Sequence, residues 1–221
     1  MFIASIDIET TGLIPENSDI LQFAVVLDNL ADPKPIEQLP KFEAIFVKNH
    51  YQGDPAALAM HPNIFKKIDL ARKKKLEVCP ETGTKFMDLD HLPTALDVFF
   101  QDHGLKINEK TNKIYVTPAG KNVASFDLPF LKAKISDWGP IYWLARTLDP
   151  AVLYLDISKD INLPDMKTCM ERAGIGGEVA HTALEDALMV IKLIRHKLVN
   201  NVCAAVKKET KKGKSRKESR S

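Results

Sequence analysis

The chain has 221 residues, of which 45% are hydrophobic and 27% are charged. This balance is typical of one globular domain, and it excludes a wholly disordered chain. No apolar run approaches the roughly 20 residues needed to span a bilayer, and the amino terminus lacks the basic and apolar regions of a secretory signal. The three cysteines, Cys79, Cys169 and Cys203, form no C-x-x-C pair. We therefore expect a cytoplasmic protein with neither a disulfide framework nor a zinc knuckle.

The net charge of +2 is unevenly distributed. Residues 207–221 contain eight Lys or Arg and two Glu, so they carry +6, which leaves −4 for residues 1–206. We predict a domain over residues 1–203 and a basic, disordered tail over residues 204–221. The tail would increase non-specific affinity for nucleic acid or act as a localisation signal. A net-negative body would contact nucleic acid only locally or through metal ions.

The first half of the chain begins with three expected strands, which are Met1–Ile8, Ile20–Leu27 and Phe42–Val47. Short connections favour an antiparallel meander. Pro55–Lys75 is predicted to be helical, with a break at His61-Pro62 because a residue before proline disfavours the helix. Cys79–Asp90 is predicted to be a loop.

The second half alternates helices and strands. We expect helices at Pro93–His103, Asp127–Ile135, Pro164–Ala173 (ending at Gly174) and Ala183–Val202, and a strand at Ile114–Val116 or extending to Ala119. This pattern indicates a single mixed α/β domain.

Two acids interrupt the most apolar expected strand. Asp7 and Glu9 are two residues apart, so their side chains point to the same face of a strand. Burying two adjacent carboxylates is costly unless a proton or a cation joins them. The alternative is an exposed strand end that carries two solvated acids.

A third acid, Asp127, has almost only apolar neighbours in the sequence VASFDLPFL. It is a candidate ligand. With Pro129 two residues later, however, it also fits an ordinary helix N-cap, and taken alone the cap is the better interpretation.

The fourth acid lies at the start of the last helix. Thr182 and Glu185 form a capping-box pattern, which places Asp186 on the apolar stripe that continues to Val190. His181 precedes the cap and would lie outside the helix, where it can approach Asp186. The alternative for His181 is an ordinary polar loop residue.

Together these segments resemble the three motifs of the DEDDh 3′–5′ exonucleases. This family includes ribonuclease T and the DNA polymerase III proofreading subunit, and it belongs to the ribonuclease H-like superfamily. The similar segments are DIETTG (Asp7–Gly12), NVASFDLPFL (Asn122–Leu131) and HTALEDA (His181–Ala187), and the likeness covers about residues 1–200. The sister group carries a tyrosine four residues before its last Asp. Here that residue is Thr182, so the histidine branch is the better match.

The resemblance implies an α/β fold with a five-stranded mixed sheet, its second strand antiparallel to the others, flanked by helices. It also implies two Mg²⁺ or Mn²⁺ ions held by Asp7, Glu9, Asp127 and Asp186. His181 would be the general base, since its ordinary pKa of about 6.5 suits proton transfer near neutral pH. The expected reaction releases nucleoside 5′-monophosphates from a 3′ end.

Substrate contacts are expected around the first motif. Backbone groups of Thr10 and Thr11 and the side chain of Leu13 are candidates to hold the 3′-terminal nucleotide, with Leu58 and Met60 against its base. The alternative for these apolar side chains is core packing. The basic run at residues 72–75 would lie along a phosphate backbone or be a solvated helix face.

The expected partners are 3′ ends of single-stranded DNA or RNA and, for a proofreading enzyme, a polymerase or another replication or repair protein. No membrane partner is expected. Two alternatives stay open: the same chemistry on RNA, and a non-catalytic nucleic-acid-binding module.

Overall fold

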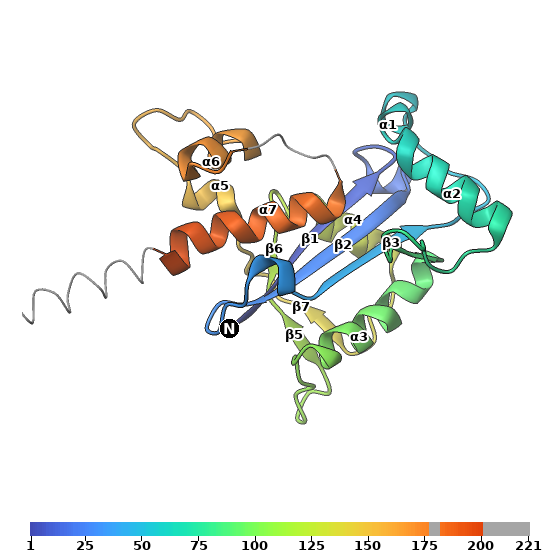
Figure 1. Ribbon diagram of the computed structural model, residues 1–221, viewed down its shortest axis with the longest axis horizontal. Coiled ribbons are helices and arrows are strands. Elements are labelled where there is room, and N and C mark those ends of the chain that lie inside the picture. Colours follow the sequence, from blue (N-terminus) through green and yellow to red (C-terminus); the bar gives the residue numbers. More distant parts are fainter. Residues whose placement is uncertain (177–181, 201–221) are drawn as a thin grey trace, which may run out of the picture.

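The computed structural model describes residues 1–176 and 182–200, and it has an α/β architecture built on a five-stranded mixed sheet (Figure 1). The strands follow the order β4-β3-β2-β1-β6, and a separate two-stranded sheet pairs β5 with β7. Their bounds are β1 Phe2–Thr10, β2 Ile20–Asn29, β3 Lys41–Phe46, β4 Lys85–Met87, β5 Ile114–Val116, β6 Pro118–Ala119 and β7 Ile141–Trp143.

The first three strands form the expected antiparallel meander. Phe23 of β2 lies opposite Ile8 of β1 and Ala44 of β3. Because β4 runs parallel to β3 and β6 runs parallel to β1, β2 is antiparallel to the other four strands, as predicted. All but the last residue of β2 are buried, which explains its nearly continuous apolar sequence.

The helices surround this sheet (Figure 1). Their bounds are α1 Pro55–Met60, α2 Pro62–Lys74, α3 Leu92–Asp102, α4 Asp127–Lys134, α5 Pro150–Leu153, α6 Met166–Ala173 and α7 Ala183–Arg195, which continues as a π-helical turn over His196–Asn200. Short 3₁₀ turns lie at Pro15–Asn17, Ile36–Gln38 and Leu89–His91. Across the described ranges, no helix combines the length and apolar character that crossing a bilayer would require.

Separate apolar clusters fasten the helices to the sheet. Helix α7 packs across β1 and β2, where Val190 and Ile194 meet Ile3 and Val26. Helices α3 and α4 close the cluster that contains the phenylalanines of β2 and β3. Helix α2 packs its Ile68 into a third cluster beside β3. The long helix that carries Asp186 therefore lies directly over the strand that carries Asp7 and Glu9.

An ion pair fixes the far end of α7. The Arg195 guanidinium binds the Asp28 carboxylate of β2 through two hydrogen bonds, from Nε (2.7 Å) and from a terminal nitrogen (2.6 Å). The Asp28 side chain is fully buried. A paired and fully hydrogen-bonded arrangement is what a buried carboxylate requires, so α7 is held at one defined position along the sheet.

One sequence prediction about local structure is wrong, and a second is confirmed only in its shorter form. The segment Cys79–Asp90 is more than a loop, because it contains β4 and a 3₁₀ turn. The strand expected at Ile114–Val116 is confirmed as β5, which pairs with β7. Its extension to Ala119 is not, because Pro118–Ala119 form the separate strand β6, which pairs with β1. In both cases the strand exists through pairing with a distant partner, which local periodicity does not reveal.

Most of the other predicted helix boundaries are close, but the helix expected over Ala183–Val202 changes to a π-helical turn after Arg195, and its last two residues lie outside the described ones. The break at His61 separates α1 from α2. Helix α6 begins at Met166 rather than Pro164, because the Asp165 side chain accepts the hydrogen bond of the Thr168 N–H as its N-cap. It ends where predicted, at Gly174, whose φ of +66° is a conformation that suits glycine.

Candidate functional site

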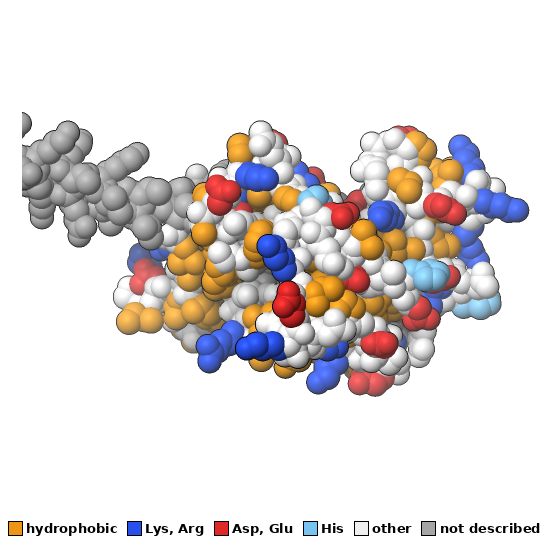
Figure 2. All heavy atoms as spheres, turned by 90° about the horizontal axis from the view of Figure 1, so that it is seen from below, with side chains coloured by type: hydrophobic (Ala, Val, Ile, Leu, Met, Phe, Trp, Pro, Cys, Tyr) orange, Lys and Arg blue, Asp and Glu red, His pale blue; other side chains and the backbone are white. Residues whose placement is uncertain are grey.

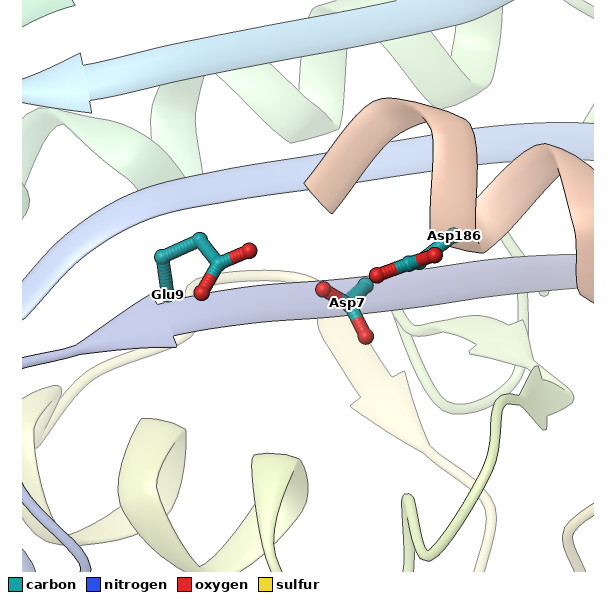
Figure 3. A group of neighbouring side chains, drawn as sticks. All are labelled: Asp7, Glu9 and Asp186. Carbon is teal, nitrogen blue, oxygen red and sulfur yellow. The ribbon is translucent and has the colours of Figure 1, made fainter. Parts of the chain in front are cut away.

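Three carboxylates converge between β1 and the first turn of α7 (Figure 3). Asp7 and Glu9 project from the same face of β1, as their spacing predicts, and Asp186 points down from the helix towards them. Each offers a ligand oxygen within 4.8 Å of the other two. We call Asp7, Glu9 and Asp186 the carboxylate trio. The three side chains are partly exposed, so solvent reaches the group.

The start of α7 places Asp186 in this group. Thr182 is the N-cap, as predicted, and its hydroxyl accepts a hydrogen bond from the Glu185 N–H (3.4 Å). The same hydroxyl donates to the Glu185 carboxylate (2.6 Å), which is exposed and turned away from the trio. The neighbours Ala183 and Ala187 are buried against the sheet, so Asp186 follows them towards β1.

Crowding and burial change the acidity of the trio. The pKa of Asp7 is raised well above its ordinary value, first by burial and then by the nearby charges of Asp127, Glu9 and Asp186. Burial, together with Asp186, raises the pKa of Glu9 to about 7. Carboxylates in this arrangement favour either a proton or a cation between them. The donors are hard oxygen atoms, which suit Mg²⁺ or Mn²⁺ rather than zinc.

Asp127 is held differently from the trio. It is the first residue of α4 rather than its N-cap, a position that Phe126 occupies. The Asp127 side chain is almost completely buried, and its Oδ1 accepts the hydrogen bond of the Ile8 N–H (3.1 Å). Strand β1 pairs with β6 only as far as Ser5. The Asp127 carboxylate therefore accepts the Ile8 N–H beyond the point where β6 pairs with β1.

The same placement controls the charge of Asp127. Burial raises its pKa to about 7, while hydrogen bonds from two backbone N–H groups, its own and that of Ile8, oppose the change. The structure therefore brings three of the four predicted acids into one group. It ties the fourth to the strand between Asp7 and Glu9. The predicted base, His181, lies outside the described residues.

A histidine that the sequence analysis did not assign to the site lies beside Glu9. The Nδ1 atom of His61 is 3.6 Å from Glu9 Oε2, and both side chains are largely buried. Burial lowers the pKa of His61, with the Thr10 backbone acting in the opposite direction. In the sequence His61 was notable only for preceding a proline, so no local signal connects it with Glu9.

The segment after β1 is tied down by Thr11, which is completely buried. Its hydroxyl accepts from the Asp19 N–H (2.7 Å) and donates to the Gln52 carbonyl (2.5 Å). Its own N–H donates to the Asp19 carbonyl, and its carbonyl accepts from the Asp54 N–H. The Thr11 groups proposed as nucleotide contacts thus already connect β1 to the loop before α1. The Thr10 hydroxyl is likewise engaged, donating to the Gly12 carbonyl (2.7 Å).

An apolar hollow of about 770 Å³ opens beside this segment, between the residues after β1 and helix α1. Its lining includes Leu13, Ile14 and Met60. Leu13 is 82% exposed and Met60 is 76% exposed, so neither is a core residue. Leu58 is half-buried and is not among the residues lining the hollow. Two of the three apolar side chains expected to contact the 3′-terminal nucleotide, Leu13 and Met60, therefore border one recess.

Comparison with protein-family models gives no match to this sequence, and comparison with curated protein sequences gives none either.

Proposed function

We propose that this chain is a divalent-metal-dependent 3′–5′ exonuclease that degrades single-stranded DNA to nucleoside 5′-monophosphates. The observation that carries the proposal is the convergence of Asp7, Glu9 and Asp186, which come from β1 and from α7, the last α-helix within the described residues. Burying acids this close together opposes their ionisation, so a site of this kind needs a function to explain it.

The fold supports the proposal at a coarser level. A five-stranded mixed sheet with only β2 antiparallel is compatible with the ribonuclease H-like fold. We propose that residues 1–203 form such a domain of the DEDDh type, with the basic residues 204–221 as an appendage.

Each acid has a proposed role. Asp7, Glu9 and Asp186 would hold Mg²⁺ or Mn²⁺, and Asp127 would complete the ligand set. Bound divalent ions supply positive charge that stabilises the phosphate group in the transition state. Asp127 also keeps the strand between Asp7 and Glu9 in place through its hydrogen bond with the Ile8 N–H.

The remaining residues have proposed roles in proton transfer and in substrate binding. His181 would accept a proton from a water molecule, whose oxygen forms a new bond to the terminal phosphorus. The bond between phosphorus and the 3′-oxygen of the preceding nucleotide breaks, and that oxygen is protonated as the mononucleotide departs. Leu13 and Met60 would contact the terminal base in the hollow, which excludes water from one side of the reacting nucleotide.

The proposal is tested with single-stranded DNA labelled at the 3′ end or at the 5′ end, incubated with Mg²⁺, Mn²⁺ or EDTA. We expect the 3′ label to be released as mononucleotide, the 5′-labelled strand to shorten stepwise, and no reaction in EDTA. Matched RNA in parallel reports the preferred sugar. Internal cleavage, or no cleavage of either polymer with either metal, contradicts the proposal and favours a non-catalytic nucleic-acid-binding module.

Substitutions test the site itself. Replacing an indirect partner of a metal ligand costs about 10–100-fold in affinity or activity, so Asp7→Asn and Asp186→Asn should each cost more than about 100-fold. Glu185→Gln is the matched control. It neutralises the next carboxylate on the same helix and keeps a residue type that suits the capping box. Equal losses for Asp186→Asn and Glu185→Gln would refute the assignment of the trio.

A further inference from the structure

Helix α2 is the basic element of an otherwise acidic domain. Residues 62–75 contain six Lys or Arg and a single acid, Asp69, and therefore carry +5. Since residues 1–206 carry −4 in total, the remainder of that region carries −9. Figure 2 shows Lys and Arg side chains gathered at the right-hand end of the molecule, the end that α2 occupies in Figure 1.

The packing of α2 leaves these charges facing solvent. Its buried residues, Ile64, Ile68 and Ala71, face the cluster beside β3. Lys66, Lys73 and Lys74 are exposed, and so are Arg72 and Lys75. Two of the cations have local partners: Lys73 pairs with Asp69 (2.7 Å), and Arg72 donates to the Asn49 side chain (3.0 Å).

The other cations on this helix have no such structural role. Within residues 1–176 and 182–200, no ion pair involves Lys66, Lys67, Lys74 or Lys75. A row of unpaired positive charges on an exposed helix does not help the domain to fold, but it provides a complementary surface for a polyanion.

The direction of α2 connects this surface with the carboxylate trio. The helix begins one residue after His61, whose ring lies 3.6 Å from Glu9 Oε2, and Met60 of the hollow comes just before. From there its 13 residues extend for about 20 Å, at 1.5 Å per residue. A nucleic-acid strand whose 3′-terminal nucleotide lies at the carboxylate trio can therefore continue along α2.

We propose that the solvent-facing side of α2, on which Lys66 and Lys74 are exposed and Lys67 is half-buried, binds the phosphate backbone of single-stranded nucleic acid upstream of the 3′ end held at the trio. This inference rests on the proposed function and adds to it a preference for long single strands. Strands several nucleotides long gain phosphate contacts on α2, whereas the shortest substrates do not reach it. The contact is electrostatic and independent of base sequence, so it favours processing of long single strands of any sequence.

The test compares two triple variants of the full chain that have the same net charge. The α2 variant carries Lys66→Gln, Lys67→Gln and Lys74→Gln. The control variant carries Lys34→Gln, Lys106→Gln and Lys110→Gln, which remove three exposed lysines outside α2. Equal melting temperatures for the two variants and the unchanged chain verify that both variants fold.

Binding of a fluorescent 20-nucleotide thymidine strand is measured by anisotropy in EDTA and in Ca²⁺, over a range of salt concentrations. Each phosphate contact on a single strand contributes about 0.7 to the slope of log affinity against log salt, so the α2 variant should lose about 2 from that slope. At low salt we expect its dissociation constant to rise about tenfold. Its hydrolysis of a thymidine dinucleotide should be unchanged. An unaltered slope, or an equal loss in the control variant, overturns the inference.

The two proposals fail separately in this design, because binding is measured without hydrolysis. If the unchanged chain hydrolyses neither polymer but the α2 variant binds the 20-nucleotide strand more weakly, the phosphate-binding surface is supported and the exonuclease is refuted. If the unchanged chain hydrolyses DNA as proposed but the α2 variant binds the 20-nucleotide strand as well as the unchanged chain does, the exonuclease is supported and the role of α2 is refuted.

Discussion

The stability of the metal-free protein should fall as the pH rises from 4.5 to 7. The reason is the carboxyl group of Glu9, whose pKa increases from an ordinary 4.5 to about 7 in the fold, through burial first and the charge of Asp186 second. A carboxyl with a raised pKa binds its proton more tightly in the folded state than in the unfolded state. Its stabilising effect is therefore fully present below pH 4.5 and is lost as the pH rises through about 7.

The expected size of this effect follows from the shift. One pKa unit corresponds to 1.36 kcal/mol, so a shift of about 2.5 units amounts to about 3 kcal/mol of unfolding free energy. The Glu9 side chain is only 16% exposed, so solvent screening reduces this figure little. On the proposed function Mg²⁺ would bind the ionised carboxylates, so saturating Mg²⁺ should abolish the decline and stabilise the fold further.

Urea denaturation in EDTA at half-unit steps from pH 4.5 to 8 measures the effect. Glu9→Gln cannot ionise and should have a flatter stability profile than the unchanged chain, by about 3 kcal/mol across this range. Glu37→Gln removes an exposed acid on a distant turn and should follow the unchanged chain. If Glu9→Gln loses as much stability with rising pH as Glu37→Gln, the argument that the trio is strained without a cation is wrong.

Substitutions at three further positions probe the supporting structure. Asp127→Asn keeps an acceptor for the Ile8 N–H, so this variant should fold normally but be inactive in the nuclease assay. Asp127→Ala leaves that N–H unsatisfied, so its unfolding free energy in urea denaturation should fall by about 1–3 kcal/mol. Arg195→Ala leaves the Asp28 carboxylate buried without its partner, and the midpoint of urea denaturation should fall by the equivalent of about 3–5 kcal/mol. Gly53→Ala places a methyl group 2.3 Å from the Thr11 Cβ, so the loop before α1 must shift; KM for DNA should rise more than kcat falls.

The sequence predicted the acids of the site better than their surroundings. The capping box fixed the phase of α7, and that phase alone turns Asp186 towards the sheet. The spacing of Asp7 and Glu9 similarly fixed their common face. In these cases a local rule of helix or strand geometry determines the direction of a side chain.

Features that depend on distant packing could not be predicted in the same way. Leu13 was open to two interpretations, and its exposure follows from the path of the chain after β1. Strand β4 is three residues long with a single buried side chain, Phe86, and exists through pairing with β3. His61 reaches Glu9 because α1 and α2 meet above the end of β1, which no pattern near residue 61 encodes.

The position of Asp186 on α7 has a consequence for synthesis of the chain. Two members of the trio lie on β1, whereas the third belongs to α7, the last α-helix described. That helix also supplies Ala187, Val190 and Ile191, which cover the sheet above β1. Because nascent chains emerge from the amino terminus onwards, a polypeptide that has not yet reached α7 lacks both this cover and the third carboxylate. On the proposed function, the metal site is therefore incomplete until the segment that carries Asp186 has been synthesised.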